Sequence, residues 1–400
     1  MTNVNKSKKP VPILFTKKED CCGCGACLNK CPKQAIKMYE DKCGFIYPVI
    51  KEDKCVRCGQ CKKVCAFQNE DVKNSPIECF AAISMNSEQA KKSASAGVFA
   101  AIATKVIERG GIVYGAAFDE TWKVRHILVE TIDQLVAIQG SKYVHSDIEN
   151  KYSEIREQIL IGKQVLFSGT PCQVAGLQSY LGEKYDNLLT IDIVCHGVPS
   201  NKMFHDYIKT LESKHGGRIT AFTFRDKTLG WGINGSAVVN GKRIIIWQSA
   251  SSYLYYFTNG WIYRENCYKC PYACEHRPAD ITLGDYWGIE KEHPELLGKD
   301  GWDESNGISC VITNTEKGQV FLKQIDCKLK TSSFEKIRKG NAQLLNPCKT
   351  GKRTEIIKQY EENEWNGLEK RFNTQIGLKK YSSIIKRLLP TKVKRILKSI

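Results

Sequence analysis

The sequence CCGCGACLNKCP occupies residues 21–32, and CVRCGQCKKVC follows at residues 55–65. Each stretch holds four cysteines at the same spacing, with two residues separating the first three and three residues before the last. This spacing is typical of proteins that bind two [4Fe–4S] clusters. It predicts an N-terminal, bacterial-type ferredoxin domain whose thiolates hold clusters that carry electrons.

In such domains the fourth cysteine of each run binds the cluster of the other run, so the ligand sets are expected to cross. One cluster would be held by Cys21, Cys24, Cys27 and Cys65, and the other by Cys31, Cys55, Cys58 and Cys61. Cys22 and Cys43 fall outside the spacing and are predicted not to be ligands. Gly23, Gly25 and Gly59 suit loops that need a positive φ.

Paired cysteines also occur in zinc sites and in disulfide frameworks. Zinc sites usually place two pairs on either side of a longer loop, which differs from two compact runs of four. The chain has 19 cysteines in 400 residues, and its lysine-rich N-terminus has no apolar stretch of signal-peptide length. Its thiols are therefore expected to stay reduced, in a cytoplasmic protein of two or three domains.

The formal net charge of +17 is concentrated at the C-terminus, where residues 349–400 hold 14 Lys and Arg against five Glu. Near the end, Ile376, Leu378, Ile384, Ile385, Leu388 and Leu389 are interleaved with Lys379, Lys380, Lys386 and Arg387. This pattern predicts a basic amphipathic helix of the kind that lies on an anionic membrane or an acidic partner. A solvated helix packed on its own domain is the alternative. No nucleic-acid module accompanies the charge, so nucleic acid is not expected as a partner.

The region between residues 76 and 330 alternates short apolar runs with helical patterns. Strands are expected at 79–85, 111–118, 164–167 and 188–194, and helices at 95–108, 150–161 and 174–181. This alternation predicts an α/β core with parallel strand pairing. Residues 219–252 are rich in β-branched and aromatic residues, and Asn240-Gly241 predicts a hairpin turn in a small β insertion.

Five further cysteines lie where such a core could gather them. Thr170, Pro171 and Cys172 follow a predicted strand and open a helix, and Cys195 ends the next strand. Ligands collect at the carboxyl ends of strands in open α/β sheets. Cys267, Cys270 and Cys274 complete the candidate group. A third [4Fe–4S] cluster is the favoured interpretation, with a structural zinc site or a reactive Cys172 thiol at a helix start as alternatives.

Five motifs resemble those of a known protein family. They are SASAGVF at 93–99, GSKYV at 140–144, GTPCQ at 169–173, CHG at 195–197 and DITLGDYWG at 280–288. In this order they resemble the beta subunits of coenzyme F-420 hydrogenases and dehydrogenases, most closely the bacterial branch with a fused two-cluster ferredoxin. The similarity extends from about Asp20 to about Lys330.

The resemblance implies an α+β multidomain flavoprotein. Its expected organisation is a flexible basic tail at 1–14, the ferredoxin domain at 15–75, the family α/β domain with its β insertion at 76–335, and a basic helical region at 336–400. It assigns the third cluster to Cys172, Cys195, Cys267 and Cys270, which leaves Cys274 as a spare or alternate ligand. FAD would be contacted by Ser95, Gly97, Gly140, Ser141, Lys142 and Tyr143, although Ala96 stands where relatives often carry glycine.

Flavin suits such a protein because it accepts a hydride and releases electrons singly. Two functions are therefore considered. The first is a ferredoxin-linked reductase or dehydrogenase of an organic substrate or deazaflavin-type coenzyme, with the basic surface binding an acidic ferredoxin or partner redox subunit. The second is a non-catalytic electron-transfer subunit of a larger redox complex. No GxGxxG fingerprint follows a strand to indicate nicotinamide.

Overall fold

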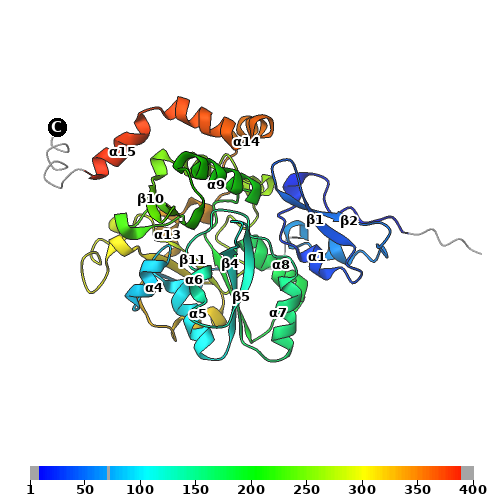
Figure 1. Cartoon of the computed structure of the whole chain (residues 1–400). Helices are drawn as coiled ribbons and strands as arrows, with labels where there is room; N and C mark the ends of the chain where they lie inside the picture. Colours follow the sequence, from blue (N-terminus) through cyan, green and yellow to red (C-terminus); the bar gives the residue numbers. More distant parts are fainter. Residues whose placement is uncertain (1–8, 70–72, 389–400) are drawn as a thin grey trace, which may run out of the picture.

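The computed structural model describes residues 9–69 and 73–388, which form a ferredoxin-like module and a larger mixed α/β core (Figure 1). In the small module, β1 (Ile36–Glu40) pairs antiparallel with β2 (Ile46–Ile50). Its short helices are α1 (Ala26–Lys30), α2 (Gln60–Lys63) and α3 (Ala66–Asn69). Gly25 and Gly59 precede α1 and α2 with φ of 77° and 74°, as the cysteine runs predict.

The core is an eight-stranded sheet in the order β13-β3-β12-β11-β7-β6-β4-β5. The strands are β3 (Glu78–Ser84), β4 (Ile112–Phe118), β5 (Val124–Val129), β6 (Val165–Gly169), β7 (Leu188–Ile193), β11 (Ile281–Asp285), β12 (Ser309–Thr313) and β13 (Cys327–Thr331). The four central strands β4, β6, β7 and β11 are parallel, which confirms the predicted parallel pairing for the strands expected at 111–118, 164–167 and 188–194. No strand was predicted at β11, and the strand expected at 79–85 is β3, which pairs antiparallel instead. The flanking strands pair antiparallel, so the sheet is mixed.

Helices cover both faces of this sheet because its central strands alternate their apolar side chains between two cores. Val113 and Leu166 pack with α5 (Val98–Glu108) and α12 (Glu316–Leu322). Tyr114 and Phe167, the next residues along β4 and β6, pack with α7 (Lys151–Leu160) and α8 (Pro171–Leu181) on the opposite face. Shorter helices are α4 (Ser87–Lys92), α6 (Leu135–Ile138), α11 (Ile289–Glu292) and α13 (Phe334–Gly340).

Two helix boundaries differ from the sequence predictions. The helix expected from residue 95 begins at Val98, because Gly97 adopts φ 83° and serves as its N-cap. The helix expected from residue 174 begins at Pro171, where Thr170 and Gln173 form a capping box. The Thr170 cap and the Pro171 first position are thus confirmed, and the turn before Val174 already belongs to the helix.

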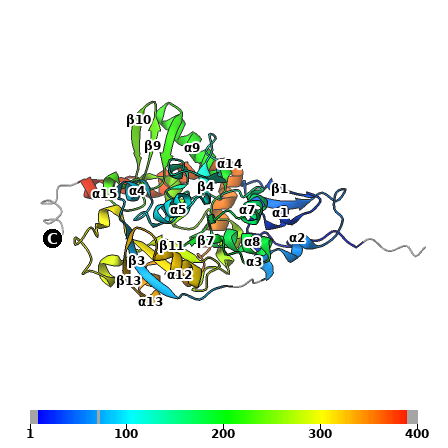
Figure 2. The ribbon, with the colours of Figure 1, turned by 90° about the horizontal axis from the view of Figure 1, so that it is seen from below.

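The β insertion is a three-stranded antiparallel sheet of β8 (Ile219–Thr223), β9 (Gly235–Val239) and β10 (Lys242–Ile246). Its hairpin turn is Asn240-Gly241, with φ of 50° and 72°, which confirms the predicted turn. Figure 2 shows this small sheet projecting from the core beside α9 (Asn201–His215).

The C-terminal helices lie along the same side of the core as α9 (Figure 1). Here α14 (Arg353–Ile376) buries Tyr360, Trp365 and Phe372 against α9 and α10 (Ser252–Thr258), and α15 (Lys379–Leu388) follows. Leu389 and the first eight residues of the predicted basic tail lie outside the described residues. Across the described chain, no helix has the length and apolar character needed to span a bilayer.

The ferredoxin-like module packs against α7 and α8, beside which Figure 1 places it. Cys22, Cys24 and Ala26 share a buried apolar cluster with Tyr152 and Leu177. A Cβ at Gly176 of α8 would lie 2.9 Å from Cys24 Sγ, so this glycine lets the module approach the helix closely. The packing brings the N-terminal cysteines next to the core.

Candidate metal centres and cofactor pocket

Four cysteines of the ferredoxin-like module line one shallow surface pocket. They are Cys31, Cys55, Cys58 and Cys61. Pro12 and Val56 form part of the rim, and Cys58 is solvent-exposed. We call these thiols the distal group. Its members come from both cysteine runs, which is the combination expected for the second ligand set.

The remaining cysteines of the two runs, Cys21, Cys24, Cys27 and Cys65, form the proximal group. Burial, followed by the charges of the other three thiols, raises the pKa of Cys27 well above its usual range. Burial and the charge of Cys24 raise the pKa of Cys65 to about 11. These four thiols therefore lie within electrostatic reach of one another, and their assignment as one ligand set stays a prediction.

A third group of thiols comes from distant parts of the core. Burial, followed by the charges of Cys195 and Cys270, raises the pKa of Cys267 well above its usual range. Burial and the charge of Cys172 raise the pKa of Cys195 and of Cys270 to about 12 in each case. The structure therefore brings Cys172, Cys195, Cys267 and Cys270 together. We call them the core group.

Local structure explains how each side chain reaches this place. Cys172 is in the first turn of α8, where its Sγ lies 3.2 Å from the capping hydroxyl of Thr170. Cys195 follows the carboxyl end of β7, and Cys267 lies in the 3-10 turn Glu265–Lys269, with Cys270 directly after it. The end of β7, the start of α8 and the turn at Glu265–Lys269 thus converge. This is the arrangement expected at the carboxyl edge of parallel strands.

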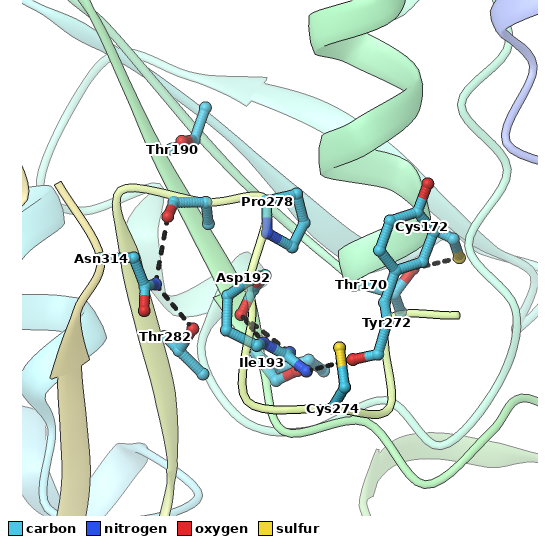
Figure 3. A network of polar contacts seen from close by, with 12 residues as sticks. Thr170, Cys172, Thr190, Asp192, Ile193, Tyr272, Cys274, Pro278, Thr282 and Asn314 are labelled. Atoms are coloured by element: carbon cyan, nitrogen blue, oxygen red, sulfur yellow. Dashed lines mark hydrogen bonds and ion pairs between the residues drawn. The ribbon is translucent and has the colours of Figure 1, made fainter. Parts of the chain in front are cut away.

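Cys274 occupies a different environment. Its Sγ lies 3.3 Å from the carbonyl oxygen of Pro271 and 3.2 Å from that of His276, within its own loop. Figure 3 shows Cys274 on this loop and Cys172 beside Thr170 at the helix start. The structure therefore favours Cys270 over Cys274 as the neighbour of Cys172.

A buried ion pair supports the loop between Cys270 and the sheet. Arg277 Nη2 donates to Asp192 Oδ1 at 2.9 Å, and both side chains are almost fully buried. Arg277 also donates to the carbonyl oxygens of Tyr272 at 2.6 Å and Ile193 at 2.9 Å. One guanidinium thus ties the end of β7, which leads to Cys195, to the loop that follows Cys270.

The residues predicted to contact flavin lie on two loops, at residues 95–97 and 140–143. Ser95 Oγ is buried without a hydrogen-bond partner in the described structure. Gly140 has φ 74°, and a Cβ there would meet only the carbonyl oxygen of Lys92, at 4.0 Å. Gly97 serves packing, because a Cβ would lie 3.0 Å from Ala90 Cα. The loops that carry Ser95 and Gly140, including Ser141, are therefore neighbours.

A polar network connects this site to the β insertion. Arg225 pairs with both carboxylate oxygens of Asp285, at 2.7 and 3.1 Å, and donates to Tyr143 Oη at 3.2 Å. Trp231 Nε1 donates to Asp285 at 2.8 Å and stacks on Trp287 with ring centroids 4.5 Å apart. The LGDYWG motif and Tyr143 thus meet on one buried guanidinium.

Two lysines add positive charge here. Lys142 Nζ donates to the carbonyl oxygens of Ala137 at 2.9 Å and Gln139 at 2.8 Å, and burial lowers the pKa of Lys142 to about 7. Lys227 Nζ donates to the carbonyl oxygens of Ala90 and Ser95. Burial, with the charge of Arg225, lowers the pKa of Lys227 to about 8. Two partly desolvated amines and an unpaired buried hydroxyl suit an anionic ligand such as a cofactor phosphate.

His196 is a residue of the Cys195 loop that lies within electrostatic reach of Asp285. It follows Cys195 in the chain, and burial lowers its pKa while the charge of Asp285 acts in the opposite direction. Asp285 is the carboxylate that holds Arg225 and Trp231. The loop that carries Cys195 and the polar network of Asp285 are therefore neighbours.

Models of known protein families match most of the chain. Residues 79–150 match the N-terminal domain, and residues 162–336 the C-terminal domain, of the family described as coenzyme F420 hydrogenase/dehydrogenase, beta subunit. Residues 20–69 match the 4Fe-4S dicluster domain. The chain belongs to the coenzyme F420 hydrogenase/dehydrogenase beta-subunit family. The resemblance noted in the sequence is thereby confirmed, with the ferredoxin domain fused in front.

Among solved structures, the chain is similar to one in the F420-reducing [NiFe] hydrogenase complex from Methanosarcina barkeri. The identity is 15%, the match covers 75% of this chain and 92% of that chain, and the TM-score is 0.42. No curated protein sequence matches this family member.

Sequence reasoning missed several residues of these sites in this family member. Arg225 and Lys227 come from the β insertion, where no local pattern marks them. Cys22, predicted to be a non-ligand and the nearest substitute for Cys21, interacts with the thiols of Cys172 and Cys24, which together with burial raises its pKa well above the usual range; whether it is a ligand stays a prediction. Only the doubled Cys21-Cys22 could have drawn attention to it.

Two other features complete the description of possible ligand sites. Across the described residues, no three His, Cys, Asp or Glu side chains are placed to hold a single metal ion. A cavity of about 300 Å³ lies between the end of α5 and α12, lined by residues including Arg109, Lys317 and Phe321. None of the predicted site residues lines this cavity.

Proposed function

We propose that this chain is an iron–sulfur flavoprotein oxidoreductase that passes electrons between [4Fe–4S] clusters and FAD. Its substrate would be an organic molecule or a deazaflavin-type coenzyme, and a ferredoxin would supply or accept the electrons. Family membership supports iron–sulfur electron transfer of the F420 beta-subunit type. The third cluster, FAD and the substrate class are the proposed elements.

The observation that carries the proposal is a set of three thiol groups, of which the proximal and core groups are connected through Cys22. The set consists of the distal group with its exposed Cys58, the proximal group and the core group. Cys22 contacts Cys24 on one side and Cys172 on the other. His196 lies within electrostatic reach of Asp285, which holds Arg225.

Bound flavin would supply the conversion between hydride transfer and single-electron transfer. The chain's own residues would do the rest. Lys142 and Lys227 would offset the negative charge of the cofactor. Arg225, fixed by Asp285, would hold Tyr143 and the β insertion against the pocket. The stacked Trp231 and Trp287 would exclude water from one side.

The proposal is tested by anaerobic purification and quantitation of iron, acid-labile sulfide, zinc and flavin per chain. About twelve iron and one FAD support it, because three four-iron clusters are expected. About eight iron with zinc and no flavin would leave an electron-relay subunit. A flavin that is bleached by an electron donor and reoxidised by a small molecule identifies the reductase.

Replacing Lys142 with methionine should weaken FAD binding roughly ten- to hundredfold, since a hydrogen bond to a charged group contributes about 1.5–3 kcal/mol. In the unsubstituted protein, affinity should fall as pH rises above about 7, because the free Lys142 amine loses its proton there. Equilibrium dialysis of FAD between pH 6 and 9 measures both effects. Lys163→Met, on the exposed surface, is the control. Unchanged FAD affinity in Lys142→Met would show that Lys142 does not contact FAD.

The distal group is surrounded by basic side chains that suit an acidic electron carrier. Lys33, Lys54, Lys62 and Lys63 are exposed around it, against the exposed Glu52 and Asp53. Reversing two charges with Lys62→Glu and Lys63→Glu should slow reduction by an acidic ferredoxin about tenfold at low salt, because charge steering raises association rates by 10 to 10³. Stopped-flow reduction across ionic strength measures this. Lys105→Glu on α5 is the control, and equal salt dependence in both variants would argue against docking here.

A further inference from the structure

Arg264 is a buried cation at the junction between the ferredoxin-like module and the core. Its side chain is fully buried. Nε donates to the carbonyl oxygen of Cys21 at 2.9 Å, and Nη2 lies 3.7 Å from Cys21 Sγ. The guanidinium carbon stands 4.0 Å from the ring centroid of Tyr47. The side chain is thus held by the proximal group although its backbone belongs to the core.

The backbone around the first cysteine run makes room for this cation. Gly23 has φ 70°, and a Cβ there would lie 3.2 Å from both Arg264 Cζ and His145 Cε1. A side chain at position 23 would therefore push the guanidinium away from the Cys21 loop. The close approach of the Arg264 guanidinium to the Cys21 loop therefore depends on glycine at position 23.

No carboxylate forms an ion pair with Arg264 among the described residues. The nearest acid along the chain, Glu265, instead pairs with Arg353 at 3.0 Å and accepts from Tyr47 Oη at 2.8 Å. Arg264 Nη1 is buried without a hydrogen-bond partner in the described structure, and so is the nearby His145 Nε2. A buried cation without an acidic partner is costly unless other negative charge faces it.

The proximal and core cysteine groups can supply that negative charge. The titratable groups facing Arg264 include Cys21 of the proximal group and Cys267 of the core group, along with Cys22 and Tyr47. Cys172 of the core group also feels its charge. Arg264 therefore lies within electrostatic reach of both groups, at the place where Cys22 connects them.

We propose that Arg264 is a positioning residue that raises the reduction potentials of the proximal and core iron–sulfur groups together. The inference rests on the proposed function. Reduction adds one electron to a cluster, with no bond made or broken, and so increases the total negative charge of the cluster and its thiolate ligands. A permanently protonated guanidinium favours that state, most strongly where the surroundings are poorly solvated. Matched potentials would keep electron transfer across the junction reversible.

The test is an anaerobic, EPR-monitored potentiometric titration of the complete, cluster-loaded protein. Arg264→Gln should lower the equilibrium constant for reduction of the proximal and core groups about tenfold, which is about 59 mV for a one-electron couple. Arg264→Lys keeps the charge and should restore most of the difference. The distal group, which includes the exposed Cys58, should keep its reduction potential in both variants.

A second pair of variants leaves Arg264 in place. His145→Glu would set a carboxylate beside the guanidinium and should lower the same two potentials, whereas His145→Gln should not. Arg353→Gln, which removes a cation already paired with Glu265, is the control for a nearby charge change. If Arg264→Gln does not retain its iron, the difference in potential between His145→Glu and His145→Gln tests the proposal instead.

The outcomes separate this inference from the proposed function. Iron and sulfide are counted before titration, and fewer than about twelve iron in the unsubstituted protein contradicts the proposed function. Full iron content with unchanged potentials in Arg264→Gln or His145→Glu overturns the role of Arg264. Equal shifts in Arg264→Gln and Arg264→Lys would likewise overturn it, because the guanidinium would then act through shape and hydrogen bonds instead of charge.

Discussion

Replacing Cys195 with serine should remove about four of about twelve iron atoms per chain. Cys195 is one of four mutually interacting thiols in the core group, and the described surroundings place Cys172 and Cys270 next to it. Loss of one thiolate would leave an incomplete ligand set in a buried site, because a serine hydroxyl is a poor substitute for a thiolate on iron. Iron and sulfide quantitation with EPR measures the loss.

FAD should be retained in Cys195→Ser, because Arg225 is held by Asp285, and Lys142 by the carbonyl oxygens of Ala137 and Gln139, without help from the Cys195 thiol. The retained flavin should no longer be reduced from the ferredoxin side. Cys274→Ser is the matched control, since its thiol interacts with carbonyl oxygens of its own loop and should be dispensable for iron binding. Loss of iron in the Cys274 variant, with full iron in the Cys195 variant, would exchange the two assignments.

The local features of this protein could be predicted from its sequence because each depends on neighbours in the chain. The spacing of the two cysteine runs predicts the ferredoxin domain, and Asn240-Gly241 predicts the hairpin with its two positive φ values. Alternating apolar runs predict three of the four parallel central strands, β4, β6 and β7, but not β11. The antiparallel strands at the sheet edges depend on pairing between distant segments, as for β3 with β12, and periodicity alone carries no such information.

The site residues that were missed share a physical cause. Arg264 meets Cys21 across 243 positions of sequence, and Arg225 meets Asp285 across 60. No spacing rule relates such partners, because their meeting is decided by how the module docks on α8 and how the insertion folds over the pocket. Cysteines were predictable as candidates because thiols are rare ligands with a narrow chemistry, whereas a buried arginine cannot be told from a surface one in sequence.

Asparagine in place of Asp192 should destabilise the core by about 3–5 kcal/mol, the usual cost of removing one partner from a buried ion pair. Arg277 would keep its buried positive charge while losing the carboxylate 2.9 Å away. The loop from Cys270 to Arg277 should then open more often, because Arg277 also holds the Tyr272 and Ile193 carbonyl oxygens. Native-state hydrogen exchange of the Arg277 amide, which donates to Asn74 at 2.9 Å, measures this opening.

Exchange of that amide should accelerate by about 10² to 10⁴ in Asp192→Asn, the factor that corresponds to 3–5 kcal/mol. Glu88→Gln, which removes the acid of an exposed pair with Lys91, should leave it unchanged. The double variant Asp192→Leu with Arg277→Met removes both charges and should recover much of the protection, because apolar replacement of a complete buried pair is often neutral. Recovery of protection without recovery of core-group iron would show that Arg277 positions the Cys270 loop for metal binding as well as stabilising the fold, whereas equal exchange in Asp192→Asn and the unsubstituted protein would contradict both roles.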